Sequence, residues 1–406
     1  MAIEISLVRH GETEANAAGV WQGSSDSPLS MAGRDQVTRL GLRFEANRFD
    51  LVLTSDLGRA LQTSTVIGGA EVDERWRELH LGSWEGLTQS EIADRDPDVA
   101  AALGSGADIA FGGGERVSDM VERLIDAFYE LAGRLADGER ALVIGHGGAL
   151  LTLISVLLGV DTRHRILRLT NTSVTTIRVQ DGRPQLATFN DMTHLAGDPV
   201  RADEGSTHVI LARHGETVAN LEARWQGQTG GSLTERGRDQ ARRLTDVFPS
   251  VDALYSSPLT RAVDTARFVA DGHRIELREL PDLQEISFGR WERMTRAEVE
   301  SADPSAWAEL VSGIDVARGG TGETFGQVQQ RMLDAIGAMA DHHSGKKIGV
   351  ISHGGATRAF AARVLGLDFA GRQALGLLDN TAMARVVYSS RGPALASWNL
   401  TPHLGG

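Results

Sequence analysis

The feature that most constrains this chain is that one unit of about 200 residues is written twice. The segment LVRHGETEAN at 7–16 returns as LARHGETVAN at 211–220, an offset of 204 positions (211 − 7). Further pairs of segments follow in the same order, such as VIGHGGA and VISHGGA at an offset of 207 (353 − 146), and the offset stays between 202 (261 − 59) and 209 (399 − 190). A repeat of this length indicates a duplicated domain rather than a solenoid built from units of 20–50 residues.

A polar stretch near the middle of the chain marks the boundary between the copies. Residues 197–206 read GDPVRADEGS, with Gly, Pro and three acidic residues, which is typical of a linker. We therefore expect one domain at 1–196 and a second at 207–406, joined by this linker. Whether the two halves pack on each other, and what oligomer the chain forms, stays open from the sequence.

Each copy alternates short apolar runs with segments of helical periodicity. In the first copy the expected strands are 3–8, 51–53 and 141–144. The expected helices are 31–44 after a Ser30 N-cap, one from about 57, 120–135 and 149–158. This alternation favours an α/β fold of two tandem three-layer domains, each a mostly parallel sheet with helices on both faces. In such sheets ligands bind beyond the carboxyl ends of the strands, so polar residues that follow the strands are expected at one rim.

The composition limits the partners of the chain. A formal net charge of −13 argues against binding to a nucleic-acid backbone, and no apolar run reaches the ~20 residues that cross a bilayer. The absence of cysteine excludes a disulfide scaffold, a thiolate metal site and a cysteine nucleophile. The first residues, MAIEISLVRHG, lack the features of a signal peptide, which favours the cytoplasm as the location.

Each copy also places two histidines, two arginines and one glutamate in a fixed order. In the first copy these residues are Arg9, His10, Arg59, Glu78 and His146, and in the second Arg213, His214, Arg261, Glu285 and His353. Two guanidiniums and two imidazoles suit a dianionic oxyanion such as phosphate. A neutral imidazole can attack phosphorus, and a carboxylic acid can protonate the leaving alkoxide. A single such histidine is more often structural, but a purely structural role does not explain the recurrence of the whole set. A metal site is the competing interpretation, and the arginines argue against it because they would repel a cation.

The residues of each set lie in four longer motifs. These are RHGETEAN, SDLGRALQT, RELHLGSWEG and GHGG in the first half and RHGETVAN, SSPLTRAVDT, QEISFGRWE and SHGG in the second. With these motifs, both halves resemble the histidine phosphatase superfamily, also called the phosphoglycerate mutase-like family. The resemblance implies that His10 and His214 accept the phosphoryl group and that Glu78 and Glu285 donate protons. It implies a phosphate-binding role for Arg9, Asn16, Arg59, His146, Arg213, Asn220, Arg261 and His353.

The two copies differ around these motifs. Where the first has Asp26, Pro28, Gly86 and Arg116, the second has Gly230, Ser232, Arg293 and Thr324. These differences predict different pocket rims, and hence different substrates or one weakened site. The segments 94–117 and 303–324 diverge most, and we expect them to shape specificity.

Together these features predict a phosphomonoester hydrolase for small phosphorylated metabolites, with a phosphohistidine intermediate, two tandem active sites and no metal or organic cofactor. The glutamate and the second histidine stand 68 residues apart in both copies (146 − 78 and 353 − 285), whereas the mutases of this family tend to carry a longer insertion there. Three alternatives stay open. They are phosphoryl transfer of the phosphoglycerate mutase type, a repurposed lyase activity, and a half that only binds phosphate or regulates the other.

Overall fold

The computed structural model describes the chain except for residues 1, 46–47, 99–106, 161–164, 201 and 405–406. The chain divides into two compact units. The first comprises Met1–Gly159 and Arg168–Val200, and the second comprises Val160–Leu167 and Arg201–Gly406. Residues 160 and 165–167 therefore group with the second unit, although they lie within the first half of the sequence.

The sheet of the first unit has the strand order β3-β2-β4-β1-β5-β6. The strands are β1 (Ala2–Arg9), β2 (Leu51–Thr54), β3 (Glu71–Val72), β4 (Arg140–Gly145), β5 (Val174–Gln180) and β6 (Arg183–Asp191). The first four pair in parallel, and β5 and β6 add an antiparallel hairpin beside β1. The carboxyl ends of β1, β2 and β4 therefore meet at one edge.

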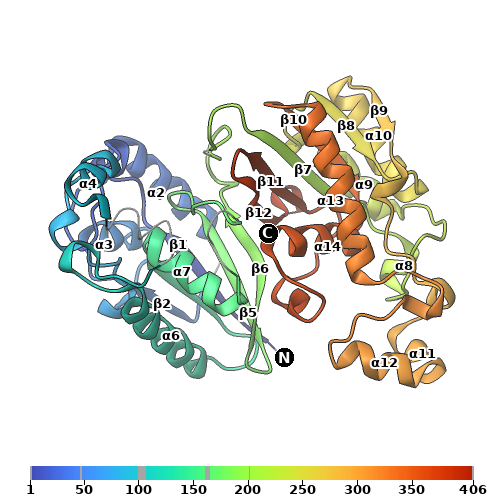
Figure 1. Cartoon of the computed structure of the whole chain (residues 1–406), viewed down its shortest axis with the longest axis horizontal. Helices are drawn as coiled ribbons and strands as arrows, with labels where there is room; N and C mark the ends of the chain where they lie inside the picture. Colours follow the sequence, from blue (N-terminus) through green and yellow to red (C-terminus); the bar gives the residue numbers. More distant parts are fainter. Residues whose placement is uncertain (1, 46–47, 99–106, 161–164, 201, 405–406) are drawn as a thin grey trace. The chain divides into compact units, whose positions relative to one another are not determined.

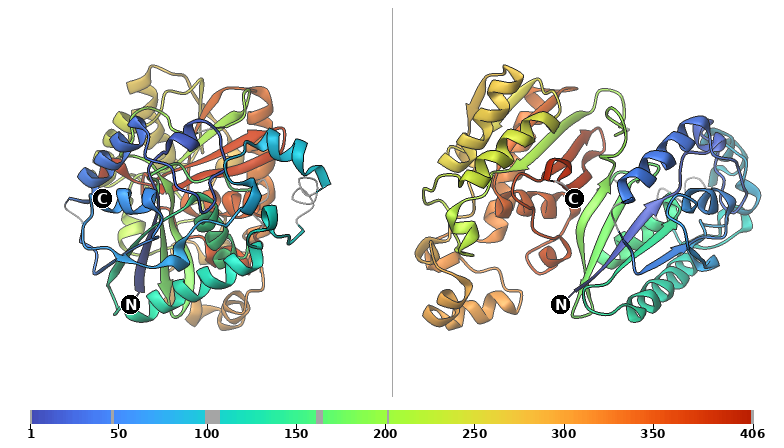
Figure 2. Two further views of the ribbon diagram at one scale, coloured as in Figure 1. Left: turned by 90° about the vertical axis from the view of Figure 1, so that its left-hand side faces the viewer. Right: turned by 180° about the vertical axis from the view of Figure 1, so that it is seen from behind.

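Helices cover both faces of this sheet. The helices are α1 (Glu14–Ala17), α2 (Met31–Phe44), α3 (Gly58–Ser64), α4 (Gln89–Arg95), α6 (Val117–Arg134) and α7 (Gly147–Leu158). On one face Leu40 of α2 and Ala60 of α3 pack against Val8 and Ile144, and on the other α7 contacts β1 and β6 and packs beside α6. Figures 1 and 2 show the sheet between the blue helices α2 and α3 and the green helices α6 and α7.

The second unit repeats this architecture with the strand order β12-β11-β7-β10-β8-β9. The strands are β7 (Thr207–Arg213), β8 (Ala253–Ser256), β9 (Leu277–Glu279), β10 (Lys347–Ser352), β11 (Met383–Ser389) and β12 (Gly392–Leu400). The helices are α8 (Val218–Leu221), α9 (Glu235–Val247), α10 (Thr260–His273), α11 (Arg296–Ala302), α12 (Pro304–Val311), α13 (Phe325–His342) and α14 (Gly354–Leu365). Leu244 of α9 and Ala266 of α10 pack on one face of this sheet, while α13 and α14 lie on the other.

The α/β class with helices on both faces of each sheet is confirmed. The expected helix 31–44 is α2, and the hydroxyl of Ser30 caps it by accepting a hydrogen bond from Gly33 N at 3.0 Å. The structure also contains the expected strands and the other expected helices of the first copy. Each boundary that was expected for them lies within three residues of the observed one. The sequence analysis did not predict the β5–β6 hairpin, although the Asp181-Gly182 turn, with φ of 52° and 72°, is a hairpin signal.

Two parts of the sequence-based expectations fall on residues outside the described part of the chain. They are 99–106 of the segment 94–117, and residue 201 of the expected linker. Among the described residues, no helix combines the length and apolarity needed to cross a membrane.

Candidate active sites

In the first unit, the predicted polar residues converge at the carboxyl edge of the parallel strands. His10 follows β1 and His146 follows β4, and the backbone N–H of His10 donates to Gly145 O at 3.0 Å. The two imidazole rings have their centroids 5.2 Å apart. In the second unit the rings of His214 and His353 lie 5.1 Å apart in the same position.

A hydrogen bond sets the tautomer of His10. Its Nδ1 lies 2.7 Å from the carbonyl oxygen of Gly11, and because a carbonyl can only accept, Nδ1 carries the proton. Nε2 is then left with its lone pair. Burial, followed by the charges of Arg59 and Arg9, lowers the pKa of His10 well below 6.5, so the ring is neutral at neutral pH. A neutral imidazole with a lone pair at Nε2 is the nucleophilic form.

The second unit repeats this geometry with one addition. His214 Nδ1 lies 2.7 Å from Gly215 O, and burial followed by Arg261 and Arg213 lowers the pKa of the ring. Arg261 Nε also donates to His214 Nε2 at 3.2 Å. That contact agrees with a lone pair at Nε2, because the nitrogen must accept there.

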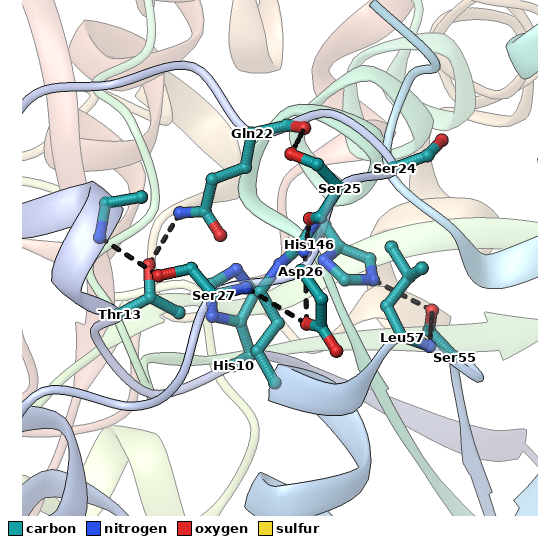
Figure 3. Close-up of polar contacts among 12 residues, drawn as sticks. His10, Thr13, Gln22, Ser24, Ser25, Asp26, Ser27, Ser55, Leu57 and His146 are labelled. Carbon is teal, nitrogen blue, oxygen red and sulfur yellow. Dashed lines mark hydrogen bonds and ion pairs between the residues drawn. The ribbon is translucent and has the colours of Figure 1, made fainter. Parts of the chain in front are cut away.

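The arginines are fixed by backbone carbonyl groups. Arg59 is 1% exposed, and its two terminal nitrogens donate to Ser25 O at 2.7 Å and to Gly23 O at 2.6 Å. Arg9 Nη1 donates to Leu169 O at 2.6 Å. Figure 3 shows the segment 22–27, which supplies the acceptors for Arg59, beside His10 and His146. A guanidinium held in this way is a rigid positive charge next to the nucleophile.

Arg213 and Arg261 are held alike in the second unit. Arg213 Nη1 donates to Leu378 O at 2.6 Å, and Arg261 donates to Thr229 O at 3.0 Å and Gly227 O at 2.7 Å. Burial is the main cause that lowers the pKa of Arg261 to about 10, so this side chain still carries its charge at neutral pH.

Backbone N–H groups at the start of α7 hold the carboxylate of Glu78. Gly148 N and Ala149 N each donate to it at 2.8 Å, and Leu79 N donates at 3.0 Å. A helix N-terminus favours a negative group at this place. The fit is tight, because a Cβ on Gly148 would lie 2.8 Å from Glu78 Oε1.

Glu285 occupies the same position at the start of α14. It accepts hydrogen bonds from Gly355 N at 3.0 Å, Ala356 N at 2.7 Å and Ile286 N at 2.9 Å. Both units therefore place one carboxyl group on the sheet edge that carries the two histidines.

The second histidine of each unit contacts a serine that follows a neighbouring strand. His146 Nε2 lies 2.8 Å from Ser55 Oγ, as Figure 3 shows, and His353 Nε2 lies 2.8 Å from Ser257 Oγ. The Nδ1 atoms of both histidines are buried and have no hydrogen-bond partner among the described residues. A ligand oxyanion would supply one.

Sequence reasoning missed an asparagine that links Asn16 to the nucleophile. Asn171 Nδ2 donates to His10 O at 3.0 Å and to Asn16 Oδ1 at 3.3 Å. Asn380 Nδ2 makes the same pair of contacts, to His214 O at 3.0 Å and to Asn220 Oδ1 at 3.1 Å. The dipeptide Asn-Thr recurs at 171–172 and 380–381, and this recurrence is the signal that could have found it.

A second set of missed residues holds the segment that carries each glutamate. Arg123 donates to Arg77 O at 2.9 Å and to Glu78 O at 3.2 Å, and pairs with Glu115 at 2.7 Å. Arg331 is its counterpart, since it donates to Glu285 O at 3.1 Å and pairs with Glu323 at 2.7 Å. Among the described residues, the hydrogen bonds of these arginines go to backbone carbonyls and one acid, so they position the glutamate segment.

The differences between the copies lie at the rim of each site. Asp26 Oδ1 is 3.9 Å from Arg59 Nη1, and a Cβ on the neighbouring Gly58 would lie 2.1 Å from the Asp26 carboxylate. The second copy has Gly230 in place of Asp26 and Thr260 in place of Gly58. The side chain thus changes place between these two positions, which avoids the 2.1 Å contact that a Cβ at position 58 would make with the Asp26 carboxylate.

The difference at Arg116 changes the start of a helix. Thr324 caps α13 through its hydroxyl and forms a capping box with Gln327. Arg116 makes no such cap and donates to Asp108 O at 2.6 Å, while the Asp108 carboxylate accepts from Ser118 N at 3.1 Å. None of these exchanges removes a member of the histidine, arginine and glutamate sets.

Within the described residues, no group of three or more His, Asp or Glu side chains is arranged to hold a metal ion.

Comparison with known proteins assigns the family. The sequence model of the histidine phosphatase superfamily (branch 1) matches residues 5–192 and 209–401. A probable phosphoglycerate mutase GpmB of Serratia proteamaculans is 37% identical over 206 residues, which cover 48% of this chain and 95% of the relative. A metal-independent phosphoserine phosphatase of Arabidopsis thaliana is 32% identical over 212 residues, which cover 51% of this chain and 87% of the relative.

Solved structures match one half of the chain at a time. Bacillus stearothermophilus YhfR is 37% identical, with a TM-score of 0.44 over 48% of this chain and 99% of its own. A mycobacterial glucosyl-3-phosphoglycerate phosphatase complexed with VO3 is 28% identical, with a TM-score of 0.44 over 48% of this chain and 99% of its own. With the family model matching both halves, the chain belongs to the histidine phosphatase superfamily as two tandem copies and is a phosphatase- or mutase-type enzyme.

Proposed function

We propose that this chain hydrolyses small anionic phosphomonoesters at two tandem active sites, with His10 and His214 as the phosphoryl acceptors. The observation that carries the proposal is the fixed tautomer of each ring. In both units Nδ1 is bound to a carbonyl oxygen at 2.7 Å, so the lone pair lies at Nε2. Two arginines close to each ring, one buried and one half-buried, supply positive charge for a phosphoryl group in transit.

The proposed reaction has two steps in the first unit. His10 Nε2 attacks phosphorus and forms a P–N bond while the P–O bond to the leaving group breaks, and Glu78 gives its proton to the departing oxygen. A water then attacks phosphorus, a P–O bond forms while the P–N bond to His10 Nε2 breaks, Glu78 takes a proton from the water, and phosphate leaves. Arg9, Arg59 and His146 would hold the oxygens of the phosphoryl group. The second unit has an equivalent residue in every role, and neither site needs a metal or organic cofactor in this scheme.

Hydrolysis is favoured over transfer by the short 68-residue spacing between the glutamate and the second histidine in each copy. The relatives carry both names, since one is a probable phosphoglycerate mutase and another a metal-independent phosphoserine phosphatase. We therefore propose substrates of the size and charge of phosphoserine or a phosphoglycerate. We also propose that the activity resides in the cytoplasm.

Rapid-quench trapping tests the proposal. The full chain would react with a ³²P-labelled phosphomonoester, and acid-labile, base-stable label is expected on the peptides of His10 and His214. In His10→Ala and His214→Ala, one labelled peptide should disappear each time. Label on one peptide only would reassign the other unit as a phosphate-binding or regulatory module. Label recovered on a second metabolite rather than as inorganic phosphate would identify a mutase.

A further inference from the structure

Three arginines gather in the second unit outside the histidine, arginine and glutamate set, two of them over the ring of one phenylalanine. The guanidinium carbons of Arg372 and Arg318 lie 3.4 and 4.7 Å from the centre of the Phe369 ring. Arg358 Nη2 donates to Arg372 O at 2.7 Å. Arg318, Arg358 and Arg372 are called the arginine cluster below.

Positive charge in the arginine cluster exceeds the negative charge beside it. Asp315 is the one acid that an ion pair joins to it among the described residues, through Arg318 at 2.8 Å. That carboxylate also accepts hydrogen bonds from Phe325 N and Gly326 N, each at 2.8 Å. Among the described residues, one carboxylate thus accompanies three guanidiniums, and it pairs with Arg318 while it is also bound by two backbone N–H groups.

The cluster is largely withdrawn from water. Arg318 is 5% exposed, and the Nε atom of Arg358 is buried without a hydrogen-bond partner among the described residues. Burial, followed by the charge of Arg372, lowers the pKa of Arg358 to about 10. Arg358 and Arg372 are half-buried, so the cluster has one buried member and two more accessible ones. A buried donor without a partner is costly, and an oxyanion would satisfy it.

The fold does not require two of these arginines, Arg318 and Arg358. The first unit has Leu151 five residues after His146, where the second has Arg358 five residues after His353. It has Phe111 at the first position of the 3-10 turn Phe111–Gly113, where the second has Arg318 in Arg318–Gly320. The same architecture therefore forms with apolar residues at both positions.

The cluster lies near the glutamate of the second unit. Arg358 follows Gly355 by three positions in α14, so the two residues share one helix face, and helical side chains lean toward the N-terminus. Gly355 N binds the carboxylate of Glu285. The loop of Arg318 also contacts the segment after Glu285, since Glu323 N donates to Ser287 O at 2.9 Å. Figure 1 shows α14 beside α13 in this unit.

We propose that the arginine cluster of the second unit is an anion subsite that binds a carboxylate or phosphate group. The bound group belongs either to the substrate or to a separate ligand. The first of these two cases rests on the proposed function. A charged hydrogen bond to an arginine fork contributes enough that loss of one arginine should weaken binding about tenfold or more.

The first arm of the test measures binding without turnover. The full chain would be titrated calorimetrically with malonate as wild type, Arg358→Leu, Arg372→Gln and Arg363→Leu. Arg358→Leu installs the residue of the first unit, and Arg363→Leu is the matched control because Arg363 is an exposed arginine of the same helix. We expect a malonate site in wild type and Arg363→Leu that weakens about tenfold or more in the other two. If Arg358→Leu does not fold, the malonate affinity of Arg372→Gln tests the proposal.

The second arm identifies the source of the anion. In a His10→Ala background, KM would be compared between phosphoserine and p-nitrophenyl phosphate. If the group belongs to the substrate, Arg358→Leu raises KM for phosphoserine alone. If it belongs to a separate ligand, both KM values stay the same and malonate changes turnover of p-nitrophenyl phosphate in a way that Arg358→Leu abolishes. A His10→Ala chain without any turnover would count against the proposed function, and the binding arm would still decide on the subsite. Malonate binding equal in Arg358→Leu, Arg372→Gln and Arg363→Leu, with no KM difference, would overturn the inference.

Discussion

Replacing Gly148 by alanine should disable the proton-donating step of the first unit while leaving its nucleophile in place. A Cβ at this position would lie 2.8 Å from Glu78 Oε1 and 3.2 Å from Glu78 Cδ. Carbon and oxygen atoms pack at roughly 3.5 Å or more, so the carboxyl group must move by about 0.7 Å. That movement strains the 2.8 Å hydrogen bonds from Gly148 N and Ala149 N. A displacement near 1 Å can cost about 10²-fold in rate, which is about 2.7 kcal/mol of activation free energy.

The assay compares leaving groups in a His214→Ala background, so that only the first unit turns over. Gly148→Ala is expected to lower kcat/KM about 10²-fold for alkyl phosphates, whose leaving groups need a proton. For p-nitrophenyl phosphate, whose leaving group needs little protonation, the loss should stay below about tenfold. The matched control is Gly133→Ala in α6, where a new Cβ meets nothing within 4 Å and activity should be unchanged. Equal losses on both classes of substrate would refute the assignment of Glu78 as the proton donor.

The other predictions use simpler measurements. His10→Ala and His214→Ala should each leave residual phosphate release, and the double variant should lose several orders of magnitude. Vanadate should bind at two sites per chain in calorimetry, and one site would mean that one unit cannot hold an oxyanion. Activity on p-nitrophenyl phosphate should survive EDTA; loss that added metal restores would contradict a mechanism based on arginine and histidine. Because burial followed by Arg59 and Arg9 lowers the pKa of His10, the acid limb of kcat/KM should lie below pH 6.5, and Arg59→Gln should shift it upward. The same lowered pKa means that the unfolded chain binds protons that the folded chain does not, so the free energy of unfolding in urea should fall as pH drops below 6.5.

The sequence predicted those features that depend on local patterns and on strand order. Parallel strands bring their carboxyl ends to one edge, and for that reason His10 and His146, 136 positions apart (146 − 10), could be expected near each other. The structure brings them to a ring separation of 5.2 Å. The N-cap at Ser30 follows from residue type alone.

Hydrogen bonds from side chains to backbone carbonyl oxygens could not be predicted in the same way. Arg123 binds the carbonyl groups of the glutamate segment, and any residue can supply a carbonyl, so the sequence carries no mark of the acceptor. The tautomer of His10 likewise depends on a 2.7 Å contact with a backbone oxygen. Asn171 could have been identified from the sequence, because its Asn-Thr dipeptide recurs in the second copy. A recurrent asparagine near a strand is equally compatible with a turn residue, however, so the signal is not specific.

Comparison of the two units shows which part of each site is free to change. The groups around the nucleophile repeat closely, since Nδ1 of His10 and of His214 binds the carbonyl oxygen of the following glycine at the same 2.7 Å, and only His214 has a further bond from Arg261 Nε. The rim does not repeat, because Asp26 gives way to Gly230. Phosphoryl chemistry demands the same charges whatever the ester, whereas the leaving group differs between substrates.

This difference between nucleophile and rim argues for two working sites with different substrate preferences, rather than one working site and one that has lost its activity. A site that had lost its activity would be expected to lose the costly buried charges first. Arg261, however, is still 1% exposed and still fixed by Gly227 and Thr229. The exposed Asp26 carboxylate, 3.9 Å from Arg59 Nη1, should disfavour substrates with a second negative group in the first unit. The second unit has a glycine there and should accept such substrates better. A panel of phosphomonoesters assayed on His10→Ala and His214→Ala tests whether the two units differ in substrate preference. The two variants should rank acidic and neutral esters in different orders, and identical rankings would show that the rim exchanges do not set specificity.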